Sequence, residues 1–330
     1  MKLSQLVRYL NYLEDHDGDR VMTESNSLMK YIHDVMWYVD TNDLQFPGVS
    51  TRMELVLSDI KESLGAYDSV IDALKKLIKS NIEIWQPNYF RKSHTLHERL
   101  QQTIAQGMFT PNPPTLTEDS AEYIRSRLAW YGNWQQPGMI IHPGKTDWIE
   151  SMVALDPLYL VDVSYDLLKP CLEKFPPEYR ARVRQCILSE KYLMKPGQTY
   201  GSTESSDQKI PTGQIGIILA YDYFNHRTLD FMTFLLPKIS MWLKPGGSLL
   251  FTFNNCDHAS AVELVENDSA CYTPGHLVMA AAERANFEIK HCYDISESVT
   301  WLEIQKPGTL SSQRAGQALA RPVAKANRIQ

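Results

Sequence analysis

The sequence has little of what marks a secreted, membrane-spanning or metal-scaffold protein. Its five cysteines are odd in number, widely spaced and contain no C-x-x-C pair, which is typical of buried or free thiols in a reducing compartment. No apolar run approaches the ~18 residues that span a bilayer, and the first residues lack the apolar segment of a signal peptide. We therefore expect a cytoplasmic protein without a membrane segment.

A strong excess of one charge is also missing. The net charge is only −6, with 43% hydrophobic, 22% charged and 10% aromatic residues among 330, which is close to globular averages and fits about two domains. The five basic residues from Lys306 onward have no acidic neighbour there, so the tail carries +5 and the preceding chain −11. We therefore expect no nucleic-acid partner except at this tail, where a solvating role and an anionic partner both stay open.

The first part of the chain, residues 1–110, is predicted to be a helical domain. Its most regular stripe runs from Met53 to Ile78 in alternating spacings of four and three residues, the a/d pattern of a coiled coil or of a long helix. The stripe either faces the core of its own chain or mediates self-association into a homo-oligomer. The domain would accordingly serve oligomerisation or substrate docking.

The proline-rich segment 111–117 is predicted to be a linker, because proline disfavours helix and interior strand. In the following domain, 118–307, short apolar runs alternate with helix-length segments, which predicts an α/β fold with a doubly wound, mostly parallel, seven-stranded sheet. The last two runs lie close enough to form an antiparallel edge hairpin. The seven runs are Met139–Ile141, Leu158–Val163, Arg184–Leu188, Ile215–Ala220, Ser248–Phe253, Phe287–Tyr293 and Val299–Gln305. Residues 308–330 are predicted to be a basic flexible tail.

An acidic residue ends the second apolar run. Asp162 closes this run before a predicted helix that begins at Tyr165. Open α/β sheets bind ligands beyond the carboxyl ends of their strands, where a carboxylate suits a grip on the two hydroxyls of a ribose. Asp162 as a purely structural cap of the next helix is the alternative.

In their order and spacing, several segments resemble the class I S-adenosylmethionine-dependent methyltransferases, from about Trp130 to Pro307. They are Pro143–Trp148 after the first strand, Val161–Ser164, Ile217–His226, the L-K-P-G-G turn in Leu243–Phe251, Tyr272–Leu277 and Ala285–Glu288. The first loop departs from the family pattern E/D-x-G-x-G-x-G, because only Gly144 remains and Ile140 stands in place of the acid. The chain therefore resembles a class I methyltransferase that has a degenerate glycine-rich loop and is preceded by an added N-terminal helical domain.

The resemblance implies a Rossmann-like fold, S-adenosylmethionine as the cofactor, and transfer of its methyl group to an undetermined acceptor by in-line positioning. It assigns cofactor contacts to His142, Pro143, Gly144, Asp162, Glu190 and Ala220. A catalytically inactive, methyltransferase-like structural or interaction protein in a larger assembly stays open as the alternative, because the first loop is degenerate.

The resemblance assigns the methyl-transfer pocket to the loop after the fourth strand, with Tyr221, Asp222 and His226 as catalytic residues. His226 is the best candidate base because imidazole titrates near neutrality; the alternative is a histidine that merely begins the next helix. Asn254 and Asn255 follow the fifth strand, where they either contact substrate or form an ordinary turn.

Two further patterns give weaker indications of function. His94 and His97 lie on one helical face but have no cysteine or carboxylate beside them in the sequence, so no metal site is expected. The polar segment Lys195–Gly213 rises between the third and fourth strands, as a substrate-gating loop or as a disordered one.

The stripe predicts a measurable oligomeric state. If it mediates self-association, Leu64→Glu and Ile71→Glu place charges in the seam and lower the mass in solution, as measured by light scattering. A monomer in wild type and in both variants would reject self-association through the stripe.

Overall fold

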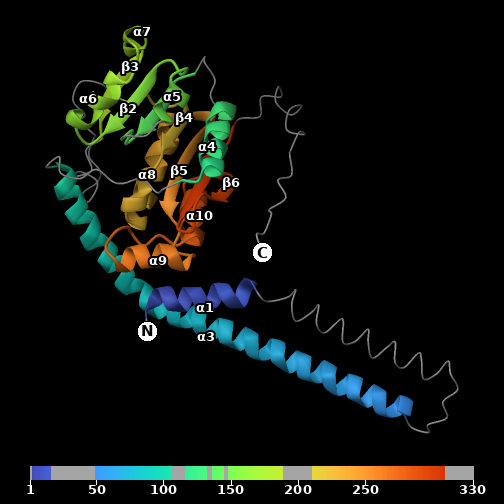
Figure 1. Ribbon diagram of the computed structural model, residues 1–330. Helices are drawn as coiled ribbons and strands as arrows, with labels where there is room; N and C mark the ends of the chain where they lie inside the picture. The colour runs from blue at the N-terminus through green and yellow to red at the C-terminus, as the bar shows by residue number, and fades with distance from the viewer. Residues whose placement is uncertain are drawn as a thin grey trace.

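The computed structural model of the chain describes residues 2–15, 49–105, 116–131, 136–144, 148–188 and 210–308. Its body is a seven-stranded sheet in the order β3-β2-β1-β4-β5-β7-β6, with helices on both faces (Figure 1). Strands β1 to β5 are parallel where they pair, and β7 runs antiparallel to both β5 and β6. The predicted Rossmann-like α/β sheet with its antiparallel edge hairpin is confirmed.

The strands follow the apolar runs of the sequence closely. They are β1 (Gly138–Ile141), β2 (Leu158–Asp162), β3 (Val183–Ile187), β4 (Ile215–Ala220), β5 (Leu243–Asn254), β6 (Glu288–Asp294) and β7 (Val299–Gln305). β5 starts earlier than the apolar run, because the N–H of Gly246 donates to the carbonyl of Lys306 and the N–H of Lys306 to that of Gly247. The L-K-P-G-G segment is therefore the start of the strand, with Gly246 at a φ of +75° that favours glycine.

Alternate residues of the central strands build two separate cores. Met139 and Ile141 of β1 pack toward α8 (Leu229–Trp242) and α10 (Gly275–Arg284), whereas Ile140 packs toward the opposite layer. That opposite layer consists of α4 (Glu118–Tyr131), α5 (Trp148–Met152) and α6 (Tyr165–Glu173). The short α7 (Pro177–Arg180) precedes β3. A sheet covered on both faces has near-continuous apolar strands, and β4 is buried at every position.

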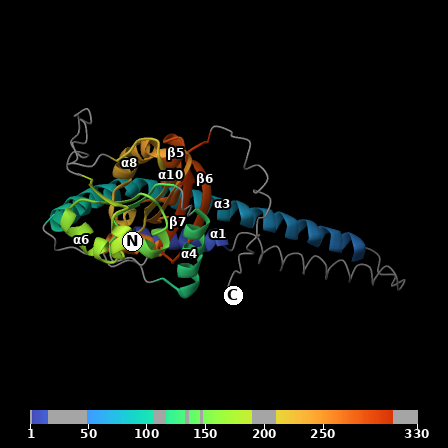
Figure 2. The ribbon, with the colours of Figure 1, turned by 90° about the horizontal axis from the view of Figure 1, so that it is seen from above.

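Two helices from the N-terminal part of the chain cross the carboxyl-end side of the sheet. Helix α1 (Leu3–Asp15) and the long α3 (Val49–Ala105) lie side by side below α9 (Ala259–Glu266), and α3 extends well past the body (Figures 1 and 2). An apolar cluster joins these three helices and contains Leu3, Leu6, Val7, Ala261, Val262 and Val265. Within the described ranges, no helix combines the length and apolar character needed to cross a membrane.

One end of the heptad stripe can be placed. Ile78 packs against the cluster of α1 and α9, together with Ile82, so this end faces its own chain. The side chains of the stripe from Met53 to Leu74 lie outside the described residues, and both interpretations stay open for them. The same holds for most of the predicted linker and of the Lys195–Gly213 loop, and for residues 309–330.

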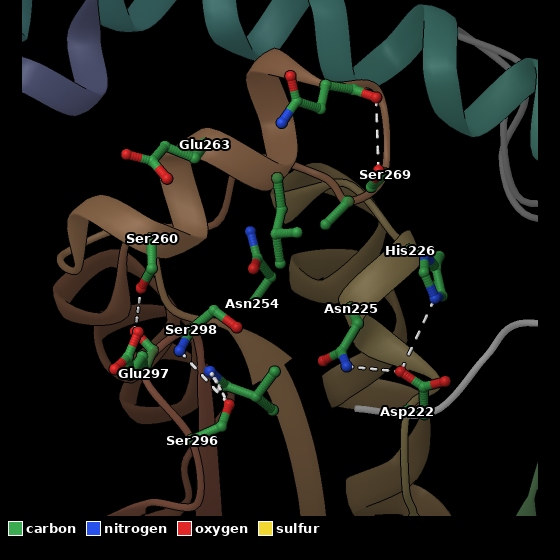
Figure 3. Close-up of a pocket in the computed structure, with 14 residues that line it drawn as sticks. Asp222, Asn225, His226, Asn254, Ser260, Glu263, Ser269, Ser296, Glu297 and Ser298 are labelled. Carbon is green, nitrogen blue, oxygen red and sulfur yellow. Dashed lines mark hydrogen bonds and ion pairs between the residues drawn. The ribbon is translucent and has the colours of Figure 1, made fainter. Parts of the chain in front are cut away.

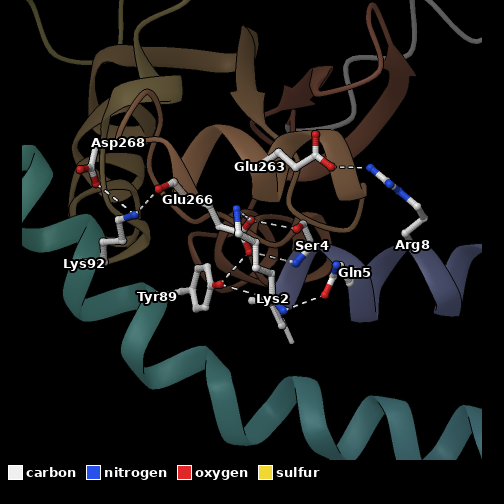
Figure 4. A network of polar contacts seen from close by, with 10 residues as sticks. Lys2, Ser4, Gln5, Arg8, Tyr89, Lys92, Glu263, Glu266 and Asp268 are labelled. Atoms are coloured by element: carbon white, nitrogen blue, oxygen red, sulfur yellow. Dashed lines mark hydrogen bonds and ion pairs between the residues drawn. The ribbon is translucent and has the colours of Figure 1, made fainter.

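A buried carboxylate forms the polar joint between the N-terminal helices and the sheet body. Glu266, at the end of α9, accepts hydrogen bonds from the backbone N–H of Ser4 at 3.2 Å, the Ser4 hydroxyl at 2.8 Å and the Tyr89 hydroxyl at 2.8 Å (Figure 4). Burial alone would raise the pKa of Glu266, but these hydrogen bonds outweigh it and lower the pKa. The carboxylate also lies at the N-terminal end of α1, where the helix dipole favours negative charge.

A second buried carboxylate fixes α4 to the sheet. Glu303 of β7 is 0% exposed and accepts hydrogen bonds from Arg127 Nε at 2.7 Å, Trp301 Nε1 at 2.9 Å and the Tyr131 hydroxyl at 2.9 Å. Burial would raise the pKa of Glu303, but its hydrogen bonds to Arg127 and Trp301 hold it below the usual range. The stability that this depressed pKa contributes is present above the unfolded pKa of about 4.3 and is lost as the pH falls below it.

Removing the partner of Glu303 is expected to destabilise the protein. Arg127→Met keeps the aliphatic stem but leaves a buried carboxylate without its cation, so we expect a loss of about 3 kcal/mol at pH 7, measured by urea unfolding. The loss should shrink toward pH 4, where Glu303 of the variant is protonated. Arg125→Met on the same helix removes only an exposed pair with Glu118 and should change stability by less than about 0.5 kcal/mol. Equal effects of the two variants would contradict the assignment.

Candidate functional site

A cavity of about 570 Å³ opens at the carboxyl ends of β4 and β5 (Figure 3). This is the edge at which open α/β sheets bind ligands. Its walls come from the loop after β4, the end of β5, α9 with its following turn, and the β6–β7 turn. The lining residues are Asp222, Asn225, His226, Asn254, Ser260, Glu263, Leu264, Asn267, Ser269, Ala270, Ser296, Glu297, Ser298 and Val299.

Asp222 is held in a tight turn just after β4. Its φ is +55°, in the left-handed region that side chains other than glycine rarely adopt, and strain of this kind clusters at functional sites. Its N–H donates to Thr252 Oγ1 at 2.7 Å, and its Oδ1 accepts from Asn225 Nδ2 at 2.5 Å. Burial raises the pKa of Asp222 to about 7, although the Asn225 hydrogen bond opposes this rise. The carboxyl group therefore titrates near neutrality.

His226 completes a buried pair with Asp222. It ends the short 3-10 helix η2 (Phe224–His226), which places its Nε2 3.7 Å from Asp222 Oδ1. Burial, and then the positive charge of Arg227, lower the pKa of His226 to about 4, so its ring is neutral at pH 7. A neutral imidazole beside a carboxyl group that titrates near 7 can take up and pass on a proton.

The next helix is separate from this pair. Helix α8 begins at Leu229 and is capped by Thr228, whose hydroxyl accepts from the N–H of Phe231 at 3.3 Å. His226 therefore precedes the helix and does not begin it.

Helix α3 supports the cavity loops from outside. The fully buried His97 places Nδ1 3.2 Å from the carbonyl oxygen of His226. The Ser93 hydroxyl accepts from the N–H of Tyr272 at 2.7 Å, in the segment that follows α9. His94 instead pairs with Asp230 of α8 at 2.9 Å, so the two histidines of the H-x-x-H pattern bind different partners. No group of three or more possible metal ligands occurs in the part of the chain that the structure describes.

The loop after β1 meets the end of β2 through a side chain. His142 has a φ of +55°, and its Nδ1 lies 3.0 Å from Asp162 Oδ2. The other carboxylate oxygen of Asp162 accepts from the N–H of Val163 at 2.7 Å. Ser164 caps α6 by accepting from the N–H of Asp166, so the interpretation of Asp162 as the cap of this helix is wrong. Asp162 faces the first loop instead.

Gly144 and Asp162 lie where the nucleoside of S-adenosylmethionine would fit, but the side chain of His142 would have to move to admit it. Gly144 has a φ of +53°, and among the described residues a Cβ there would meet the carbonyl oxygen of His142 at 3.7 Å, an ordinary contact distance. Asp162 points into the same loop, at the end of β2 where a ribose is held in such folds. It is only 4% exposed, and the imidazole of His142 occupies the carboxylate oxygen that a ribose hydroxyl would contact.

The other predicted site residues lie in different surroundings. Tyr221 packs against Trp148 in the core with α4 to α6, with ring centroids 5.4 Å apart, and it does not line the cavity. Burial raises the pKa of its hydroxyl. Ala220 is buried in the core with α8 and α10. Pro143 lies in the turn between His142 and Gly144, and Glu190 is outside the described residues.

The two asparagines after β5 have separate roles. Asn254 lines the cavity, whereas Asn255 is a structural link: its Nδ2 donates to Thr300 Oγ1 at 2.9 Å and its Oδ1 accepts from the N–H groups of Asp257 and Gly275. Sequence reasoning missed Glu263 and Ser298, which reach the cavity from α9 and from the β6–β7 turn. Neither belongs to a motif, so no local signal marks them.

Comparison with known proteins gives remote structural similarity only. No family model matches the sequence, and no curated protein matches it. Among solved structures, the chain is similar to N-methyltransferase NodS from Bradyrhizobium japonicum, with 11% identity, 58% of this chain and 98% of that chain covered, and a TM-score of 0.40. It is also similar to geranyl diphosphate C-methyltransferase from Streptomyces coelicolor (9%, 57% and 81%, TM-score 0.43). A SAM dependent methyltransferase from Aquifex aeolicus gives 11%, 56% and 88%, with a TM-score of 0.38.

The raised pKa of Asp222 predicts how stability depends on pH. A carboxyl group whose folded pKa lies near 7 binds its proton more tightly in the folded state, so its contribution falls as the pH rises from about 4 to about 7. Asp222→Asn removes this effect. We expect the stability of the variant relative to wild type to improve by about 2–3 kcal/mol between pH 5 and pH 7, measured by urea unfolding.

The matched control is Asp119→Asn on the exposed surface of α4, which should keep the wild-type pH profile. His226 acts with the opposite sign: its lowered pKa reduces stability as the pH falls from about 6.5 to 4. The comparison of each variant with wild type isolates Asp222 from that effect. A stability difference for Asp222→Asn that stays constant from pH 5 to pH 7 would exclude the raised pKa.

Proposed function

We propose that the chain is an S-adenosylmethionine-dependent methyltransferase whose acceptor binds in the cavity at the carboxyl ends of β4 and β5. The observation that carries this proposal is the buried Asp222–His226 pair, which faces that cavity on an edge of the sheet suited to ligands. The proposal is thus supported by a group that can transfer protons and that lines a cavity large enough for a small molecule.

The residues after β1 and β2 would bind the cofactor, and those after β4 would bind the acceptor. S-adenosylmethionine, when bound, supplies an electrophilic methyl group on a sulfonium, which departs as a neutral thioether once a nucleophile takes the methyl. Gly144 would let the backbone approach the cofactor closely, and Asp162 would hold the ribose hydroxyls. Asp222, whose pKa lies near 7, would accept a proton from the acceptor, while His226, which is neutral at pH 7, would orient the acceptor beside it. Holding the acceptor in line supplies most of the rate enhancement.

The second candidate is a methyltransferase-like binding or interaction protein without catalysis. The hydrogen bond between His142 and Asp162 favours it, because the carboxylate is already satisfied within the chain. An arrangement in which the imidazole never leaves Asp162 would keep the nucleoside out and still leave the cavity open to a ligand.

The remaining assignments extend this proposal to the rest of the chain. Residues 1–110 would form the helical domain, and its contact with α9 favours a part in acceptor docking, since α9 lines the cavity. Residues 118–307 would form the catalytic domain after the linker at 111–117. The basic tail at 308–330 would contact solvent or an anionic partner of a cytoplasmic protein.

Isothermal calorimetry with S-adenosylhomocysteine tests the cofactor site. We expect micromolar binding to wild type and its loss in Asp162→Ala, which removes the group for the ribose. His142→Gly frees Asp162 and relieves the left-handed backbone at this position, so it should bind roughly tenfold more tightly than wild type.

Two controls sharpen this titration. Asp166→Ala, four residues further along on an exposed position, should bind like wild type. His142→Ala removes the imidazole but keeps a side chain at a positive φ, so it separates the release of Asp162 from the relief of backbone strain. Absence of binding at millimolar ligand in both wild type and His142→Gly would refute the methyltransferase proposal and favour the second candidate.

A further inference from the structure

Two asparagine side chains in the cavity have fixed orientations. Asn254 Nδ2 donates to the carbonyl oxygens of Ala261 and Cys271, both at 3.1 Å. Asn225 Nδ2 donates to Asp222 Oδ1. Because each amide nitrogen is held by an acceptor, neither side chain can be flipped without losing these hydrogen bonds. The amide oxygens are therefore the atoms left for a ligand.

These two oxygens are buried and unsatisfied. Asn254 is 0% and Asn225 4% exposed, yet neither Oδ1 has a hydrogen-bond partner among the described residues. Both residues line the cavity (Figure 3). Buried acceptors without a partner are rare in native proteins and call for an explanation such as a ligand or an ordered water. Two of them on one cavity indicate a ligand that donates hydrogen bonds.

The charges around the cavity favour the same kind of ligand. Asp222, Glu263 and Glu297 line it, and the described lining residues include no lysine or arginine. Two cations lie near it without lining it: Arg8 of α1 pairs with Glu263, and the buried Arg227 stacks on the ring of Tyr223 at 4.5 Å and lowers the pKa of Asp222 and His226. The surface offered to a ligand is thus rich in acceptors and carboxylates, a setting that suits a protonated or neutral nitrogen with its N–H donors.

We propose that the cavity binds a small molecule through a primary or secondary amine, which Asn225 Oδ1, Asn254 Oδ1 and the Asp222 carboxylate hold by its N–H groups. This inference deepens the proposed function, on which it rests for one step only: the amine is the methyl acceptor. In that step, the bound amine first gives up an N–H proton to the Asp222–His226 pair, which frees the nitrogen lone pair. The lone pair then forms the new N–C bond as the C–S bond of the sulfonium breaks, and the sulfur leaves as a neutral thioether.

Saturation-transfer NMR on the full chain, without S-adenosylmethionine, tests the binding. The probe is n-butylamine, and n-butanol and butyrate are its controls of similar size without an ammonium group. We expect saturation transfer to the amine, a much weaker effect for the alcohol and none for butyrate. Asn225→Leu should weaken amine binding by roughly tenfold, since it keeps the branched shape but removes one acceptor together with the hydrogen bond to Asp222.

A second variant separates binding from folding. Ser260→Trp fills the cavity from its partly exposed rim, without touching the hydrogen bonds of Asn254, and should abolish the amine signal. Asn81→Ala removes an amide on α3, away from the cavity, and should leave the signal unchanged. Equal signals for amine and butyrate, an amine signal that survives both cavity variants, or no signal for any probe would overturn the proposal; the last result would assign the two oxygens to water.

The two proposals fail separately. Binding of S-adenosylhomocysteine without binding of the amine would leave the methyltransferase proposal standing and refute the amine. Amine binding without binding of S-adenosylhomocysteine would refute methyl transfer and leave the cavity an amine site.

Discussion

The burial of Asp222 is the constraint around which the carboxyl-end side of the sheet is built. A carboxyl group that is 5% exposed loses most of its hydration, and its ionised form is stabilised only as far as nearby dipoles and cations replace the water. Thr252 Oγ1 accepts its backbone N–H, and Asn225 donates to its side chain. Thr252 lies in β5, so the sheet determines its position, whereas Asn225 lies in η2 of the same loop as Asp222. The turn can adopt its left-handed conformation because these contacts hold it from two sides.

The N-terminal helices make this arrangement possible. Loops at the end of a parallel sheet are ordinarily exposed, yet here the α3 side chains Ser93 and His97 contact the segment after α9 and the loop after β4. Glu266 ties α1 and α3 to α9 by accepting three hydrogen bonds. A charge buried at such a joint contributes geometry more than net stability, because its desolvation offsets much of the attraction. The helices therefore act as a support that holds one wall of the cavity in place.

The sequence predicted the sheet well because buried parallel strands are apolar at successive positions, and such runs are visible without any structure. β4 was predicted to the residue, whereas β5 begins five residues early, because its pairing with Lys306 depends on a strand that comes later in the chain. The Asp222–His226 pair could be predicted from spacing, since the two residues are only four apart within one short loop. Its shifted pKa values could not, because they follow from burial under segments distant in sequence. The same limit applies to Glu263 and to the bond between His142 and Asp162, which are contacts between loops.

The two halves of the candidate site differ in whether their polar side chains already have hydrogen-bond partners. On the side of β1 and β2, Asp162 has both carboxylate oxygens engaged by the chain itself, so a nucleoside must exchange one hydrogen bond for another and gains only the difference. On the side of β4 and β5, the amide oxygens of Asn225 and Asn254 have no hydrogen-bond partner among the described residues, so a donor that reaches them recovers the full penalty of their burial. Binding strength on the first side is thus set by how easily His142 leaves, and on the second by how well the ligand matches acceptors already in position. Since the interaction with His142 also lowers the pKa of Asp222, movement of this one side chain connects the two sides electrostatically.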